Sequence, residues 1–232
     1  MSELIRLESL YKSYGKKPAL FNVNLSLESG KIVGLLGPNG SGKTTLIKIL
    51  NGLLTASSGT VLFEGEPIGV NSKSKIAYLP DNIYLNTWMT VRQIVSFFAD
   101  FYADFRTELA YEMLYKLDIS PDQKLKTLSK GNKEKVCLIL TMSRNAKLYV
   151  LDEPIAGVDP AARDYVISTI INNYNPDASV LISTHLIADI EQVLDEVIFI
   201  KNGSIVLHKS VDEVREENGV SVDEHFREVF KW

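Results

Sequence analysis

The chain has 232 residues, 45% of them hydrophobic and 23% charged, which is typical of a globular protein with a single well-buried domain. Its net charge of −4 argues against a nucleic-acid partner, because phosphate backbones select basic surfaces. Charged residues interrupt any apolar segment near the N-terminus, and no apolar run approaches the roughly twenty residues that cross a bilayer. We therefore expect a cytoplasmic protein without a signal peptide.

Apolar residues alternate in the first thirty positions and predict two strands separated by a turn at Gly15–Pro18. The next expected elements are strands over 31–36, 60–63 and 76–79 and a helix over 44–53. From Thr90 onward the apolar spacing becomes helical. Helices are expected over 91–98, 109–117 and 129–143, and short apolar strands over 148–151, 180–183, 197–200 and 205–207.

The alternation of strands and helices predicts an α/β fold with a mostly parallel sheet. A helical insertion over about 82–145 interrupts this fold, so that the core consists of 1–81 and 146–232 within one domain. The acidic residues of 212–224 are expected on the solvated faces of short helices. Cys137, the only cysteine, lies in an apolar run and is expected to be a buried structural thiol.

The segment after the strand over 31–36 matches the phosphate-binding pattern G-x-x-x-x-G-K-[ST] without a gap. It consists of Gly37, Pro38, Asn39, Gly40, Ser41, Gly42, Lys43 and Thr44. Glycines let successive backbone N–H groups face one concavity, and the following helix adds the positive end of its dipole. Lys43 is expected to reach the β- and γ-phosphates of ATP, Thr44 to ligate Mg2+, and Thr45 to reach the α-phosphate.

Two carboxylates, Asp152 and Glu153, end the apolar strand over 148–151. A strand end beside a phosphate loop can place Asp152 near a nucleotide-bound Mg2+. Glu153 can then accept a proton from an attacking water molecule. An acidic strand end that merely faces solvent is the alternative, and the phosphate loop makes the catalytic interpretation the favoured one.

Several further motifs occur in an order that resembles the ATP-binding-cassette (ABC) ATPases over essentially the whole chain. The resembling segments are the phosphate loop (Walker A), the strand ending in Asp152-Glu153 (Walker B), Leu128–Asn132 (the signature, usually LSGGQ), Gly157-Val158-Asp159 (the D-loop), Ser183-Thr184-His185 (the switch histidine) and Tyr14 (the adenine-stacking aromatic). The resemblance implies a P-loop NTPase core with an N-terminal antiparallel β-subdomain and an inserted helical subdomain. The signature, together with Asp81, resembles most the bacterial exporters of drugs, peptides or lipids.

The resemblance also implies a mechanism in which two ATPase subunits, identical or different, face each other head to tail with two ATPs between them. Ser129 and Gly131 would contact the γ-phosphate held by the partner, and Asp159 would couple the two sites. His185 would hold the γ-phosphate, and separate transmembrane permease subunits would anchor the dimer to the inner face of the membrane. Structural roles compete for three of these residues: Ser129 and Asp159 as helix N-caps, and His185 as a satisfied strand-end histidine. Tyr11 competes with Tyr14.

Two segments depart from the family pattern. Asp81 stands where the family has glutamine after the strand over 76–79. In the signature, Lys130 replaces the first glycine and Asn132 replaces the glutamine. An ionised aspartate only accepts hydrogen bonds and adds negative charge near Asp152 and Glu153, although it can still ligate Mg2+. We hypothesise that Lys130 of one subunit offsets the charge of Asp81 in the other; the alternative is a solvent-facing Lys130.

Three functional interpretations follow. The first is the ATPase subunit of a membrane transporter, with export favoured over import, and with Tyr84 and Trp88 near the permease. The second is a soluble ABC protein of translation or DNA repair, which a single cassette without a coiled coil disfavours. The third is a clamp that does not hydrolyse ATP, which the presence of Glu153 and His185 disfavours.

Overall fold

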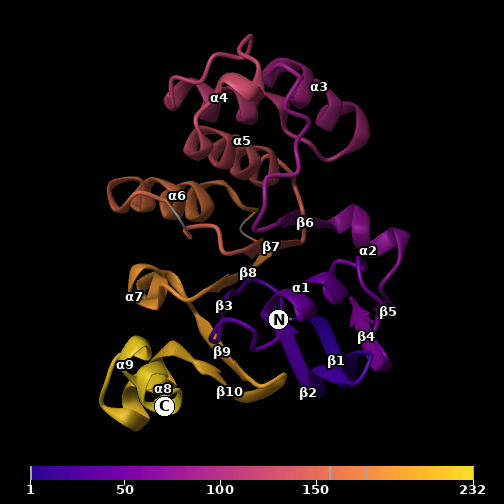
Figure 1. The fold of residues 1–232 in the computed structure, drawn as a ribbon, viewed down its shortest axis with the longest axis vertical. Coiled ribbons are helices and arrows are strands. Elements are labelled where there is room, and N and C mark those ends of the chain that lie inside the picture. Colours follow the sequence, from indigo (N-terminus) through magenta and orange to yellow (C-terminus); the bar gives the residue numbers. More distant parts are fainter. Residues whose placement is uncertain (1, 157, 176, 232) are drawn as a thin grey trace.

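The computed structural model describes residues 2–156, 158–175 and 177–231, with only the backbone of Ala161 and Ala162. Figure 1 shows two sheets with helices gathered at both ends of the larger one. The strands of the two sheets are β1 (Glu3–Tyr14), β2 (Lys17–Glu28), β3 (Ile32–Leu36), β4 (Ser58–Phe63), β5 (Glu66–Pro67), β6 (Ile76–Leu79), β7 (Leu148–Asp152), β8 (Ser179–Thr184), β9 (Glu196–Lys201) and β10 (Ser204–Ser210). The helices of the described chain are α1 (Lys43–Leu50), α2 (Val70–Lys75), α3 (Val91–Phe101), α4 (Thr107–Lys116), α5 (Lys130–Met142), α6 (Pro160–Asn173), α7 (Ile187–Ile190), α8 (Val211–Asn218) and α9 (Val222–Val229), with 3-10 turns at Leu125–Thr127 and Glu191–Val193.

The larger sheet has the strand order β10-β9-β3-β8-β7-β6. All its neighbouring pairs except β10–β9 are parallel. Strands β3, β7 and β8 are buried along their whole length, as expected for a parallel sheet covered on both faces. The predicted mostly parallel α/β core is therefore confirmed.

The smaller sheet is antiparallel and has the order β2-β1-β4-β5. Strands β1 and β2 form a hairpin that turns at Gly15, whose φ of 59° suits the left-handed conformation. This hairpin packs its apolar face, including Leu7, Val23 and Leu25, into the same core cluster as Leu46 and Ile47 of α1. The N-terminal antiparallel sheet implied by the family resemblance is confirmed.

Helices α3, α4 and α5 lie between β6 and β7 in the chain and form one end of the molecule in Figure 1. Thr90 caps α3 by accepting a hydrogen bond from Gln93 N, and α3 turns its apolar face inward. The inserted helices are thus present, while the exact boundaries at 82 and 145 stay a prediction.

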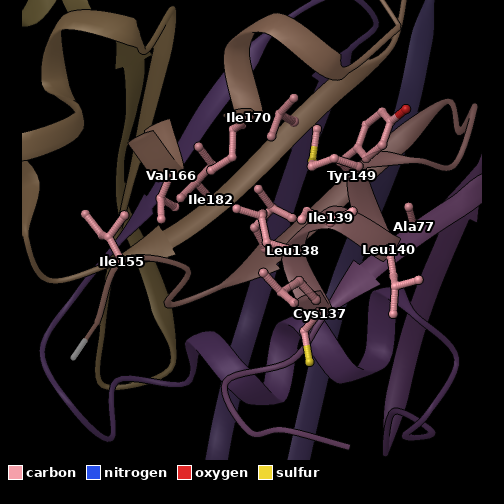
Figure 2. Packing of buried hydrophobic residues seen from close by; sticks show 14 of the residues in the cluster. Ala77, Cys137, Leu138, Ile139, Leu140, Tyr149, Ile155, Val166, Ile170 and Ile182 are labelled. Carbon is pink, nitrogen blue, oxygen red and sulfur yellow. The ribbon is translucent and has the colours of Figure 1, made fainter. Parts of the chain in front are cut away.

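Apolar side chains of α5 anchor the inserted helices to the core. Figure 2 shows Leu138 and Ile139 of α5 among Ile182 of β8, Val166 of α6 and Tyr149 of β7. Cys137 is buried in the same cluster, and burial raises the pKa of its thiol to about 12. The prediction of a buried cysteine is therefore confirmed, and the raised pKa keeps the thiol protonated and unreactive at neutral pH.

Two local differences from the predicted elements have physical reasons. Helix α1 ends at Leu50 rather than at 53, because the Asn51 side chain bonds Ile47 O and Gly52 takes a φ of 62°. Helix α2 was not predicted, because its residues over 70–75 are mostly polar and carry no helical apolar pattern. Within the described residues, no helix combines the length and apolar character that crossing a membrane requires.

The guanidinium of Arg144 joins the inserted helices to the core. It is 3% exposed, bonds Asp104 Oδ1 at 2.6 Å and Ser74 O at 2.7 Å, and lies 3.8 Å from the ring centre of Tyr102. Asp104 and Tyr102 follow α3, whereas Ser74 lies in α2 beside β6. A buried cation therefore spans the junction between the two parts.

We expect Arg144→Met to lower the free energy of unfolding by about 3 kcal/mol, because it leaves Asp104 without its buried partner. Urea-induced unfolding measures the change. The matched control is Arg92→Met, whose partner Asp122 is 76% exposed; it should change stability by less than about 1 kcal/mol. Equal effects of the two substitutions would contradict a structural role for the Arg144 junction.

Candidate nucleotide-binding and hydrolysis site

The phosphate loop joins β3 to α1 and is held by contacts that only glycine allows. A Cβ atom at Gly37 would lie 2.5 Å from Ile200 O, and one at Gly42 would lie 2.7 Å from Ala19 O. Gly42 also has a φ of 113°, which side-chain-bearing residues rarely adopt. The two glycines therefore serve the packing of the loop against β9 and the β2 hairpin, and this packing fixes the loop backbone.

Lys43 is the first residue of α1, and its side chain is only 6% exposed. Its ammonium donates to Gly37 O at 2.6 Å and lies 3.8 Å from Glu153 Oε1. Burial lowers the pKa of Lys43, and the carboxylates of Glu153 and Asp152 act in the opposite direction. A desolvated cation at the start of a helix is a strong partner for a phosphate group.

Asp152 ends β7 and is 1% exposed. Its Oδ1 accepts a hydrogen bond of 2.5 Å from Ser183 Oγ of β8, whereas its buried Oδ2 has no hydrogen-bond partner among the described residues. Burial raises the pKa of Asp152, and the nearby charges of Asp81 and Glu153 add to this, while the hydroxyls of Ser183 and Thr44 lower it. Burial thus outweighs the hydrogen bonds that stabilise the charged form of this carboxylate.

Glu153 follows directly and turns out of the strand with a φ of 53°. Its backbone N–H donates to Ser183 O at 3.0 Å and to Ser183 Oγ at 3.1 Å, which fixes this turn. Its Oε2 lies 3.0 Å from His185 Nδ1 and its Oε1 faces Lys43. A left-handed conformation costs a non-glycine residue on the order of 1–3 kcal/mol, which suggests a functional constraint. The structure therefore brings Lys43, Asp152, Glu153 and His185 together as the sequence predicted.

A family model described as ABC transporter matches residues 20–156, more than half of the chain. The chain belongs to the ABC transporter family. It is 30% identical over 213 residues to the Streptococcus pyogenes protein named lantibiotic transport ATP-binding protein SrtF, covering 90% of this chain and 92% of that one. It is also 30% identical over 221 residues to the Bacillus subtilis SkfA peptide export ATP-binding protein SkfE, covering 93% and 92%.

A solved structure of the ATP-binding subunit of an ABC transporter superimposes with a TM-score of 0.88 at 26% identity, covering 98% of this chain and 100% of that one. The likeness thus extends over the two sheets and the inserted helices. As an ABC family member, this chain is the ATP-binding subunit of a transporter and hydrolyses ATP.

The ABC phosphate loop opens into a hollow of about 360 Å³. Its lining includes Tyr14, Asn39, Gly40, Gly42, Lys43, Thr44, Thr45, Asp81 and Glu153. Tyr14 is 53% exposed there, whereas the ring of Tyr11 packs edge-on against Phe21 at 5.2 Å. These positions favour Tyr14 over Tyr11 for contact with the adenine base. Ser41 is buried beneath the loop, where its Oγ would touch any Cβ at Gly37.

The ABC signature lies at a second hollow, of about 320 Å³, between the inserted helices and the end of β7. Ser129, Gly131 and Asp159 line it, and among the described residues the two hollows share only Asp81 and Glu153. Ser129 also caps α5 by accepting a hydrogen bond from Asn132 N at 3.2 Å, so its structural role is real. The signature of a subunit therefore does not line the phosphate loop of that same subunit.

The departures from the ABC pattern and the D-loop also have definite places. Asp81 is exposed, accepts a hydrogen bond from Asn82, and lines both hollows. The side chain of Lys130 is 81% exposed, with Glu134 at 3.8 Å. Asp159 directly precedes α6, while Gly157, the first residue of the predicted D-loop, lies outside the described residues.

Sequence reasoning missed the role of Ser183 as the hydrogen-bond donor that positions Asp152. Ser183 is fully buried and pairs in register with Asp152 across β7 and β8. A serine directly after the apolar run Val180–Ile182 was the available signal, because a buried hydroxyl needs a partner.

We expect Asp152→Asn to raise the thermal midpoint of unfolding at pH 7 without nucleotide. The pKa of Asp152 is raised in the folded protein, so the protonated carboxyl is compatible with folding and the ionised carboxylate lowers the free energy of unfolding. The wild-type protein therefore loses stability as pH rises through the folded-state pKa. The gain from the neutral amide should therefore disappear below about pH 4, where the wild-type carboxyl is protonated in both states. Thermal unfolding measured across pH tests this, and a gain that persists at acid pH would contradict it.

Proposed function

We propose that this chain is the ATPase subunit of an ABC exporter, working as one of two cassettes on separate permease subunits at the cytoplasmic face of the membrane. The names of SrtF and SkfE, which refer to lantibiotic transport and peptide export, support export as the direction. Both relatives match along more than nine-tenths of their own length, which supports a comparable single-cassette subunit.

The position of Glu153 carries the catalytic assignment. Its carboxylate lies between the Lys43 ammonium and His185 Nδ1, at the end of a strand that the parallel sheet holds beside the phosphate loop. In this place Glu153 accepts the proton of the attacking water, and His185 orients that carboxylate and contacts the γ-phosphate. Lys43 binds the phosphates, and Tyr14 stacks on the adenine.

The residues present suit a magnesium ion. Asp152 Oδ2 is buried and has no hydrogen-bond partner among the described residues, and the hydroxyl of Thr44 lies near enough to lower the pKa of that carboxyl. Asp81 adds a further oxygen donor, because it lines one hollow with Thr44 and the other with Asp152. Hard oxygen ligands are those that Mg2+ prefers. No group of three His, Cys, Asp or Glu side chains in the described residues could hold a metal by itself, which suits an ion bound together with ATP phosphates. Bound there, Mg2+ would neutralise charge that develops on the phosphates.

The separation of the two hollows supports a head-to-tail pair. Ser129 and Gly131 do not line the hollow of the phosphate loop, so a second cassette is needed to bring a signature against the nucleotide. The start of α5 can present a hydroxyl and backbone N–H groups to a γ-phosphate. Asp159, on the same hollow as Ser129, then couples the two sites.

A groove of about 560 Å³ lies beside Asp81 and supports a permease contact. Its lining includes Tyr78, Tyr84 and Tyr102, and the nearby Trp88 is 65% exposed. Aromatic residues with exposed surface are enriched at protein interfaces.

We expect Glu153→Gln to reduce the ATPase rate by at least about 100-fold, because glutamine keeps the shape of the side chain but cannot accept the proton. ATP binding should remain, since Lys43 and the loop are unchanged, and an ATP-dependent dimer should be visible by gel filtration. Glu64→Gln is the control, because Glu64 pairs with Lys75 and Lys147 away from the site. A Glu153→Gln variant with the wild-type rate would refute the assignment of the base.

The Glu153→Gln variant, trapped with ATP, also tests the transporter assignment by affinity purification from detergent-solubilised membranes. We expect a polytopic membrane protein to be recovered in stoichiometric amounts. Recovery of ribosomes or DNA in its place would overturn the exporter proposal.

The charges of Asp81 and Lys130 provide a test across the dimer. We expect Asp81→Gln and Lys130→Gly each to slow hydrolysis, and the double variant to lose less than the two losses combined. Residues that interact couple by at least about 0.5 kcal/mol in such a cycle. ATPase rates of the assembled complex measure the coupling. Additive losses would show that Lys130 does not act on the charge of Asp81.

A further inference from the structure

Arg163, in the first turn of α6, bridges two segments that carry proposed catalytic residues. Its Nε donates to Val158 O at 3.3 Å and its Nη1 donates to Asp189 Oδ2 at 2.7 Å. Val158 directly precedes Asp159, and Asp189 lies in α7, the helical turn that follows His185. The family match ends at residue 156, so neither bonding partner lies within it.

The two segments are already joined at their other end. The backbone N–H of Glu153 donates to Ser183 O, and the Glu153 carboxylate pairs with His185. From Glu153 toward Val158, the chain is held by hydrogen bonds from Ala156 N to Glu153 O at 3.1 Å and from Val158 N to Ile155 O at 3.3 Å. Arg163 therefore closes a ring of contacts that contains Glu153 and His185.

The second segment is equally constrained. Leu186 N donates to Thr184 Oγ1 at 3.0 Å, and the side chains of Ile187 and Ile190 are buried in the core. Asp189 is thus carried on a short turn that is anchored in the core, four residues after His185. The planar guanidinium, with donors in a fixed fork, holds Val158 O and Asp189 at a set spacing.

We infer that Arg163 is a positioning residue that links Asp159 to His185. The inference rests on the proposed function, in which Asp159 meets the partner cassette and His185 meets the γ-phosphate. Through Arg163, a displacement of the segment at Asp159 moves α7 and hence the imidazole beside Glu153. The bridge makes the geometry of the hydrolytic residues depend on the contact at Asp159.

The exposure of the bridge separates this role from a purely structural one. The side chains of Arg163 and Asp189 are 25% and 34% exposed, and ion pairs of this kind contribute little to stability. By contrast, small misplacements of reacting groups slow catalysis by one or two orders of magnitude. Loss of the bridge should therefore affect turnover far more than folding.

The experiment measures kcat, the KM for ATP and the thermal midpoint for the full chain carrying Arg163→Met, Asp189→Asn or both. We expect each single variant to lower kcat at least about five-fold, with KM within about two-fold and little change in the midpoint. The double variant should be no slower than the slower single one, because both substitutions break the same bridge. Arg163→Lys, which keeps the charge and one donor direction, should give an intermediate kcat.

Arg6→Met is the matched control, because its ion pair with Glu3 is also partly exposed, at 48% and 33%, but lies on β1. It should leave kcat unchanged. A kcat loss below about five-fold in either single variant, multiplied losses in the double variant, or a fall in kcat that only follows the thermal midpoint would overturn the inference. A failure of the proposed function is distinguishable from a failure of this inference. It would appear as a wild-type ATPase rate in the Glu153→Gln variant, whatever the rates of the Arg163 and Asp189 variants.

Discussion

The parallel pairing of β3, β8 and β7 is the constraint on which the site depends. Leu36 pairs with Thr184, and Asp152 pairs with Ser183, so the three strands end at the same level. The phosphate loop, the turn at His185 and the turn at Glu153 therefore leave the sheet side by side, although they are far apart in the chain. Ligands of open parallel sheets bind at this carboxyl edge for the same geometric reason.

The same edge holds features that do not favour folding by themselves. Lys43 and Asp152 are ionisable and buried, and burial shifts the pKa of each toward its neutral form. Glu153 has a left-handed backbone conformation without being glycine. Two buried charges of opposite sign at this edge are better explained by a ligand that carries phosphates and a cation than by the stability of the fold. The large apolar core under the sheet compensates these costs.

The sequence predicted the elements whose pattern is local and periodic. The apolar strands β3, β7 and β8 and the helices α3 to α5 were found, because burial imposes regular spacing. Helix α2 was missed, because a polar segment carries no such pattern. The residues Lys43, Asp152, Glu153 and His185 were recognised by their motifs, but the contacts among them were not. Ser183 and Asp152 lie 31 positions apart and Arg163 and Asp189 lie 26 apart, so only the register of the sheet and the placement of α6 and α7 in the fold reveal these pairs.

The glycines of the site are of two kinds: Gly37 and Gly42 are required by contacts within the chain, and Gly131 is not. Gly37 and Gly42 are needed by the fold, because a Cβ at either would collide with a backbone oxygen. Gly131 differs: it lies in the first turn of α5, and a Cβ there would meet no atom of the described part of the chain within 4 Å. Glycine in a helix costs up to about 1 kcal/mol relative to alanine, so the internal packing gives no reason for it. A glycine at this position is explained if another surface approaches the backbone of Gly131 closely. A partner cassette and its nucleotide would do so.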